Sequence, residues 1–180
     1  MGLNCKKKSV LPGRISLCLA AAGFILLLYG CKISYSFTGA SISPDVKTIS
    51  IEYFQNRASL VQPGLSQILT DALIDKCKAQ TNLSFINSTG DVNFEGEITD
   101  YNTRPLTVSA DAQAATNRFT ITVRVKFTNA VDPELSYEQS FSRYEDYDSA
   151  FSLADVEDSL SGKIVELLVE DIFNRAFVNW

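Results

Sequence analysis

Histidine is absent from the 180 residues of the chain. Imidazole is the usual general base of a catalytic triad and a frequent ligand of zinc, so its absence excludes triads and most zinc sites. The nine glycines do not gather into a phosphate-binding loop, and no paired carboxylates or nucleophile with a base stand at a usable spacing. We therefore expect a protein that is not an enzyme and that needs neither a cofactor nor a metal ion.

One acidic cluster, formed by Glu145, Asp146 and Asp148, has the oxygen ligands that calcium prefers. A calcium ion held there would need nearby carbonyl oxygens, because the twelve-residue calcium loop with its glycine and closing glutamate is missing. We interpret residues 143–148 as a solvated, tyrosine-rich acidic turn.

Long apolar runs are also scarce, and the run at residues 15–29 holds only fifteen uncharged residues. A helix needs ~20 apolar residues to cross ~30 Å of hydrocarbon, so this run is too short to span a bilayer well. Four basic residues precede it and Gly30 follows it, which is the pattern of a secretory signal. Cys31 stands directly after Gly30, and this placement resembles the lipobox of bacterial lipoproteins.

The lipobox resemblance implies that Cys31 is lipidated on its sulfur and becomes the first residue after cleavage. Two or three acyl chains anchor a protein firmly, since each buried methylene contributes ~0.8 kcal/mol. The expected organisation is a signal peptide at 1–30, a lipidated tether at 31–45 and one domain at 46–180. The alternative is an uncleaved signal anchor.

Cysteine and basic residues become scarcer still once residues 1–30 are removed. Cys5 and Cys18 leave with the signal and Cys31 carries the lipid, so only Cys77 remains and an intramolecular disulfide is excluded. The signal also contains three Lys and one Arg of the 16 basic residues, which leaves 12 against 21 acids and a formal net charge of −9. Such an acidic domain is a poor partner for nucleic acid.

Apolar periodicity predicts four strands and two helices after the tether. Alternation predicts strands over about 46–54, 92–101, 118–128 and 135–142. In the first of them, Ile49, Ile51 and Tyr53 share the apolar side. Spacings of three and four predict helices over about 63–79 and from Ser152 onward, where Ser152 and Asp155 form a capping-box pair. Cys77 lies one turn after Leu73 and is predicted to be buried.

The order β-α-β-β-β-α predicts an α+β fold, a two-layer sandwich with two helices on one face of a four-stranded, mainly antiparallel sheet. Each predicted strand has one apolar face, so both helices are expected on the same side. The other face is expected to be wet and to carry hydroxyls and scattered charges. Its predicted members are Thr48, Ser50, Glu52, Asn93, Glu95, Glu97, Arg118, Thr120, Thr122, Arg124, Lys126, Glu138, Ser140 and Ser142.

A basic strip is the one polar cluster with a clear ligand chemistry. Arg118, Arg124 and Lys126 face outward on the third strand, and Arg104 stands in the connection before it. The planar fork of arginine suits phosphate and carboxylate, so the strip is a candidate site for a negatively charged ligand.

Cross-strand pairing is the competing interpretation of this strip. A hairpin that closes near residues 109 and 110 places Glu95 opposite Arg124 and Asn93 opposite Lys126. Such pairs would neutralise the basic charge within the sheet.

The connection from Asn102 to Thr116 is long for a hairpin, and loops of ~12 residues or more tend to be functional or disordered. We predict that it contacts a partner, in competition with the aromatic stripe Phe173, Phe177 and Trp180, for which packing under the sheet is favoured. The candidate contact residues in the connection are Pro105, Thr107, Ser109, Asp111 and Gln113.

Six short runs carry a family resemblance. They are residues 35–40 (YSFTGA), 44–49 (PDVKTI), 94–101 (FEGEITDY), 117–123 (NRFTITV), 141–144 (FSRY) and 170–174 (EDIFN). No single run is specific, but the ordered set covers essentially all of residues 31–180 and resembles the LptE lipoproteins of Bacteroidota.

The resemblance implies a Gram-negative outer-membrane lipoprotein partnered with the LptD β-barrel, the translocon that places lipopolysaccharide in the outer leaflet. It implies a domain that faces the periplasm, plugs the barrel lumen, helps the barrel assemble and contacts lipopolysaccharide. The basic strip then becomes the candidate lipopolysaccharide contact, and the connection after Asn102 becomes the candidate barrel contact. Lys32 is not the aspartate that retains lipoproteins at the inner membrane.

The alternative function is a periplasm-facing lipoprotein adaptor for another envelope complex, without lipopolysaccharide binding. A polar, hydroxyl-rich sheet face suits the wet lumen of a barrel. A carrier of acyl chains would instead need an apolar groove, which the sequence does not indicate.

Overall fold

The computed structural model describes residues 42–60, 62–107 and 116–178, which lie in the unit that spans residues 38–180. Cys31 and Trp180 fall outside these ranges, as do three candidate contact residues, Ser109, Asp111 and Gln113. Within the described ranges, no helix has the length and apolar character needed to cross a membrane.

The described elements form one sheet and two long helices. In chain order they are β1 (Thr48–Ile51), β2 (Gln55–Asn56), α2 (Leu65–Gln80), β3 (Ser84–Phe85), β4 (Val92–Thr107), β5 (Thr116–Asn129), the 3₁₀ helix η1 (Pro133–Leu135), β6 (Tyr137–Asp148) and α3 (Leu153–Phe177).

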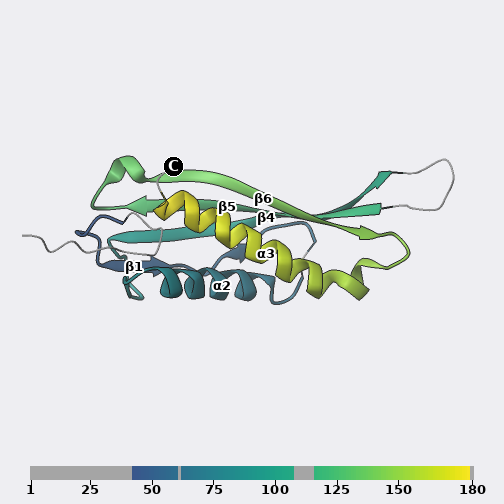
Figure 1. The fold of residues 1–180 in the computed structure, drawn as a ribbon, viewed down its shortest axis with the longest axis horizontal. Coiled ribbons are helices and arrows are strands. Elements are labelled where there is room, and N and C mark those ends of the chain that lie inside the picture. The colour runs from purple at the N-terminus through teal and green to yellow at the C-terminus, as the bar shows by residue number, and fades with distance from the viewer. Residues whose placement is uncertain (1–41, 61, 108–115, 179–180) are drawn as a thin grey trace, which may run out of the picture. The chain divides into compact units, whose positions relative to one another are not determined.

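The sheet is mixed, in the order β3-β1-β4-β5-β6, with β2 pairing with β4 beside β1. Strands β4, β5 and β6 form the predicted antiparallel meander, whereas β1 is parallel to both β3 and β4. Helices α2 and α3 both cover one face of the sheet (Figure 1). The predicted α+β class is confirmed, and the sheet has two short strands more than the predicted four.

The core lies between this face and the helices, and β5 supplies its centre. The five alternate residues of β5 from Phe119 to Phe127 are all buried, as the strict alternation of the sequence predicts. Phe173 and Phe177 of α3 are buried as well, and the Phe177 ring centroid lies 5.8 Å from that of Phe127 and 5.9 Å from that of Phe94. These two phenylalanines therefore belong to the core and not to an exposed contact stripe.

The predicted strand over 46–54 is interrupted after Ile51. Tyr53, predicted on the buried side, is 55% exposed, and Phe54 is fully buried instead. The Phe54 N–H donates to Thr70 Oγ1 on α2 at 3.2 Å, and the Phe54 ring packs against Gly96 of β4. The chain thus leaves the sheet after β1 and re-enters it as β2. At this point Phe54, and not Tyr53, turns its side chain toward the core.

Strand β3 lies between the predicted helix at 63–79 and the predicted strand at 92–101, where apolar periodicity predicts no element. It has only two residues, too few to show alternation, and it pairs in parallel with Thr48 and Ile49. Asp91 fixes this edge of the sheet, because one of its carboxylate oxygens accepts hydrogen bonds from the N–H groups of Lys47 and Thr48, each at 2.9 Å.

Two segments predicted as loops are strand. β4 continues through Pro105 to Thr107, where the ladder with β5 shifts register, so much of the predicted connection belongs to the hairpin. Residues 143–148 continue β6 and form no acidic turn, because Tyr147 is buried in the core. The predicted fourth strand also starts later than expected, at Tyr137, after η1.

Candidate functional site

The face of the sheet turned away from the helices carries the predicted polar side chains. Its exposed members come from alternate positions of β4, β5 and β6, and hydroxyls pair across strands, as between Thr122 and Ser142 at 3.0 Å. Ser50 and Asn93 lie on this face but are buried, and Ser50 Oγ donates to Asn93 Oδ1 at 2.7 Å. We call this surface the outer face.

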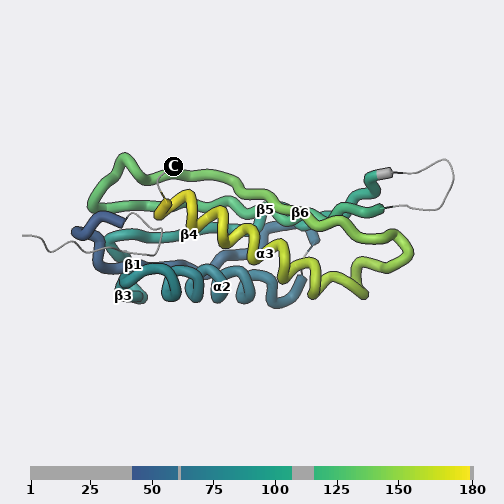
Figure 2. The backbone as a smooth tube through the Cα atoms, viewed as in Figure 1, coloured from purple at the N-terminus to yellow at the C-terminus, as the bar shows by residue number. Residues whose placement is uncertain are grey.

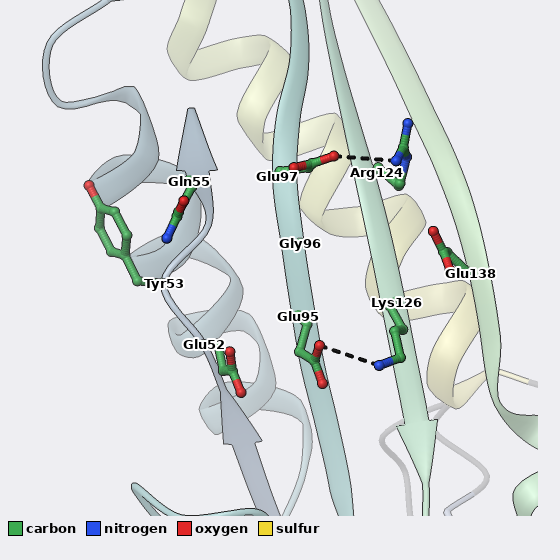
Figure 3. A pocket seen from close by; sticks show the side chains of 9 residues that line it. All are labelled: Glu52, Tyr53, Gln55, Glu95, Gly96, Glu97, Arg124, Lys126 and Glu138. Atoms are coloured by element: carbon green, nitrogen blue, oxygen red, sulfur yellow. Dashed lines mark hydrogen bonds and ion pairs between the residues drawn. The ribbon is translucent and has the colours of Figure 1, made fainter. Parts of the chain in front are cut away.

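A hollow of about 300 Å³ lies on the outer face over β4 and β5 (Figure 3). Two ion pairs cross it: Lys126 Nζ lies 3.4 Å from Glu95 Oε2, and Arg124 Nη1 lies 3.4 Å from Glu97 Oε1. The hollow is completed by Glu52, Tyr53, Gln55, Gly96 and Glu138.

The structure confirms cross-strand neutralisation of this part of the basic strip but corrects its register. Arg124 is opposite Glu97 and Lys126 is opposite Glu95, so the predicted partners are wrong by two residues. The ladder continues to Thr107, beyond the predicted end of the strand, and two irregularities in β4 each change the register by one residue. Neither the extension nor the shifts leave a periodic signal in the sequence.

Arg118 is held by a bidentate ion pair farther along β5. Its Nε and Nη2 donate to the Asp146 carboxylate at 2.8 and 3.0 Å, and its guanidinium carbon lies 3.5 Å from the centroid of the Tyr144 ring. The hydrogen bonds to Asp146 raise the pKa of Arg118 and lower the pKa of the Asp146 carboxyl. The sequence missed both partners because residues 143–148 were predicted as a turn.

Arg104 of β4 is the register partner of Arg118, so the hairpin places two cations opposite each other. Arg104 forms no ion pair with a residue of the described ranges. Both arginines line a second hollow of about 370 Å³ on the outer face. Its other lining residues are Asp100, Asn102, Pro105, Leu106, Thr120, Thr122 and Ser142.

The basic strip is thus continuous on one face but divided in character. Arg124 and Lys126 lie among four carboxylates in the first hollow, whereas the second hollow, with Arg104 and Arg118, has one carboxylate, Asp100, among hydroxyls and an amide. Like charges on neighbouring strands repel unless an anion lies between them. The second hollow is therefore the better place for an anionic group.

The outer face consists mainly of charged and hydrogen-bonding side chains. In the part of the chain that the structure describes, no three metal-ligating side chains lie together. Cys77, the one cysteine there, is fully buried on α2 as predicted. The exposed groups are ion pairs, hydroxyls and guanidinium forks, which form hydrogen bonds to polar ligands and to polar protein surfaces.

Two helices on one face of a mixed sheet, with a polar opposite face, define a two-layer α+β domain. Solved structures with this fold include an uncharacterized lipoprotein B from Nitrosomonas europaea, which is 16% identical at a TM-score of 0.50, with 80% of this chain and 88% of that chain covered. The rare lipoprotein B from Shewanella oneidensis is 10% identical at a TM-score of 0.44, with 72% of this chain and 90% of that chain covered. A comparison with curated proteins found no match.

The family model of LptE, described as lipopolysaccharide-assembly, matches residues 46–176. The chain belongs to this family, which confirms the resemblance to LptE; the run at 35–40 lies outside the matched residues. Membership assigns the chain a general role in lipopolysaccharide assembly.

Proposed function

We propose that this chain is an outer-membrane lipoprotein that plugs an LptD-type β-barrel, helps the barrel assemble and supports the insertion of lipopolysaccharide into the outer leaflet. Cys31 carries the lipid after removal of residues 1–30, residues 31–45 form the tether, and the domain at 46–180 faces the periplasm and the barrel lumen. The role is one of assembly and involves no enzymatic reaction.

The pairing of charges on the outer face is the observation that best supports the proposed plug function. Arg118, Arg124 and Lys126 are each paired with a carboxylate of the same sheet, so the face is strongly polar without a large excess of one charge. A barrel lumen is polar and wet, and a plug must fill it without unpaired buried charge. The outer face is polar, and Arg118, Arg124 and Lys126 are paired, whereas Arg104 and Glu138 form no ion pair with a residue of the described ranges.

An apolar carrier is less well supported by the same surface. A pocket for acyl chains would be lined mainly by hydrophobic side chains. The two hollows along the basic strip are lined mainly by charged, amide and hydroxyl groups. A further hollow of about 570 Å³ beside β1 has Ile51, Tyr53 and Ile86 among mainly polar lining residues. Lipopolysaccharide contact at this face would therefore involve its phosphates and sugars.

We propose Arg104, Arg118, Arg124 and Lys126 as the contacts for these anionic groups. Arg104 and Arg118 are the stronger pair, because they lie opposite each other in the second hollow and Arg118 is already oriented by Asp146. A bidentate guanidinium holds a phosphate in a fixed geometry, which a lysine does not.

We propose the end of the β4–β5 hairpin as the barrel contact. Pro105 and Thr107 form the last described pairs of β4 with β5. Figure 1 shows that β4 and β5 extend past the covering helices. The proposed contacts are Pro105, Thr107, Ser109, Asp111 and Gln113.

Co-purification tests the proposed function. The tagged chain, extracted from outer membranes in mild detergent, should bring down an LptD-type barrel in equimolar amount together with lipopolysaccharide. Recovery of another envelope protein without barrel or lipopolysaccharide would establish the adaptor function instead. The matched control is a tagged chain with Cys31→Ser, which should lose the membrane anchor and give the background of the soluble fraction.

A further inference from the structure

Strand β6 is the long free edge of the sheet. Among the described residues it pairs only with β5, so the far side of Tyr137–Asp148 presents backbone N–H and C=O groups that no strand of the described chain covers. Figure 2 shows β6 as the outermost strand of the meander. The opposite edge of the sheet is β3, which has two residues. A free edge of twelve residues is a template for strand addition.

Helix α3 fixes this edge in an extended conformation. Arg143 Nε and Nη2 each donate to the Asp171 carboxylate at 2.6 Å, and the Tyr137 hydroxyl donates to the Ile172 carbonyl at 3.4 Å. Phe141 is buried between these two contacts. An incoming strand therefore meets a prearranged partner, which reduces the entropy lost on binding.

The edge is acidic. Glu138, Glu145 and Asp148 form no ion pair with a residue of the described ranges, whereas Asp146 and Arg143 are already paired with Arg118 and Asp171. A second copy of β6 would bring the same unpaired carboxylates against these and would be repelled. A strand with lysine or arginine side chains is complementary.

We propose that the free edge of β6 receives an extended, basic segment of a partner protein by strand addition. Main-chain hydrogen bonds to β6 hold the segment. Its cations lie beside Glu138 and Asp148, which share the outward side of the strand, whereas Glu145 lies on the side of the helices. This site adjoins the outer face, because Glu138 also lines the first hollow, and it is separate from the hairpin end. It does not depend on the proposed barrel partner. Its failure and the failure of the proposed function are therefore separate results.

The test uses the full chain in detergent and a labelled ten-residue peptide of alternating lysine and valine. Binding is followed by fluorescence anisotropy, and its place is found from the amide hydrogen exchange of residues 137–148. One control peptide alternates lysine with proline, which keeps the charge but cannot form a strand. The other alternates glutamate with valine.

We expect the lysine–valine peptide alone to bind and to slow exchange within residues 137–148. The triple variant Glu138→Lys, Glu145→Lys, Asp148→Lys should bind it about tenfold more weakly or worse and should gain affinity for the glutamate–valine peptide. The matched control variant, Asp71→Lys, Asp75→Lys, Glu166→Lys, makes the same change of charge on the helices and should bind as the natural chain does.

Three results would overturn the proposal. Equal binding of the lysine–proline peptide would show that charge alone acts. Slowed exchange outside residues 137–148 would place the peptide elsewhere. Slow exchange of the β6 amides that face away from β5 before any peptide is added, with no peptide bound, would show that the edge is already occupied by another part of this chain or by a second copy.

Discussion

At the scale of single residues, the outer face pairs its charges so that the two arginines of β5 have different surroundings. Arg118 is fixed by two hydrogen bonds to Asp146, whereas Arg124 has one longer contact with Glu97. Replacing both by glutamate reverses the charge in both hollows. We expect Arg118→Glu with Arg124→Glu to lower lipopolysaccharide binding by roughly tenfold, as measured with the detergent-solubilised chain and immobilised lipopolysaccharide.

The control for this double variant carries the same change of charge on the other layer. Lys78 on α2 and Lys163 on α3 are exposed. Both lie in the helix layer, on the opposite side of the sheet from the outer face. Lys78→Glu with Lys163→Glu should bind lipopolysaccharide as the natural chain does. Unchanged binding by the Arg118 and Arg124 variant would reject the basic strip as a lipopolysaccharide contact.

Burial of the Cys77 thiol makes the free energy of unfolding depend on pH. Desolvation raises the pKa of the Cys77 thiol from 9.0 to about 12, against a smaller opposing effect of Lys76. Between these values the unfolded chain ionises the thiol and the folded chain does not, so the free energy of unfolding falls as the pH rises. The contribution of Cys77 is about 1.4 kcal/mol per pH unit.

Denaturant unfolding between pH 8 and pH 11 checks this dependence. Cys77→Ala removes the thiol and should reduce the alkaline loss of stability, although part of it should remain. Burial also raises the pKa of Tyr101 and of Tyr137, so these phenols contribute in the same direction above pH 10. Identical slopes in the natural chain and in Cys77→Ala would contradict the assignment.

At the scale of the elements, close packing at one glycine holds β2 to the rest of the sheet. A Cβ at Gly96 would lie 2.4 Å from Phe54 Cε1 and 2.7 Å from the Arg124 carbonyl oxygen. Backbone on one side and a buried ring on the other leave no room, so Gly96→Ala should lower the free energy of unfolding by ~1–3 kcal/mol. Denaturant unfolding measures the change.

Gly162 provides the opposite case for the same substitution. A Cβ there meets nothing within 4 Å, and the residue is exposed in the middle of α3. Gly162→Ala should raise the free energy of unfolding by up to ~1 kcal/mol, since alanine is the better helix former. A stabilised Gly96→Ala chain, or a destabilised Gly162→Ala chain, would contradict the packing described here.

The elements that the sequence predicts best are those with a long, regular pattern. β5 and both helices follow their apolar periodicity, and the capping box of Ser152 and Asp155 forms as predicted at the start of α3. β2 and β3 are only two residues long and pair with distant strands, so no local pattern marks them. The reversal at Phe54 depends on the space over Gly96, which is a tertiary contact.

The candidate site was predictable in composition but not in pairing. Alternation alone places Arg118, Arg124 and Lys126 on one face. Their partners depend on the register of the hairpin, which is set by irregularities between Ile98 and Asp100 and near Pro105. The stacking of Arg118 on Tyr144 further required residues 143–148 to be strand.

At the scale of the whole molecule, the two sides of the sheet serve separate purposes. The inner side forms an aromatic and aliphatic core with α2 and α3, while the outer face and the β6 edge stay polar. The three proposed contacts occupy different places: the basic strip on the outer face, the barrel contact at the hairpin end, and the strand site along β6. The proposed contacts adjoin one another, because Pro105 also lines the second hollow and Glu138 the first.

In the proposed function these contacts require attachment to the membrane. Cys31 is the residue proposed to provide this attachment. In the proposed function the Cys31 sulfur carries a diacylglyceryl group. Cells fed radiolabelled palmitate should therefore incorporate no label into Cys31→Ser and should release this variant from the membrane fraction. The control variant Cys77→Ser alters a buried thiol and should keep both label and membrane attachment. Equal labelling of the Cys31→Ser chain would contradict the lipidated anchor, because the label would then be attached at a residue other than Cys31. Acyl chains anchor a protein through ~0.8 kcal/mol per buried methylene, so loss of the lipid should also release the chain from the membrane.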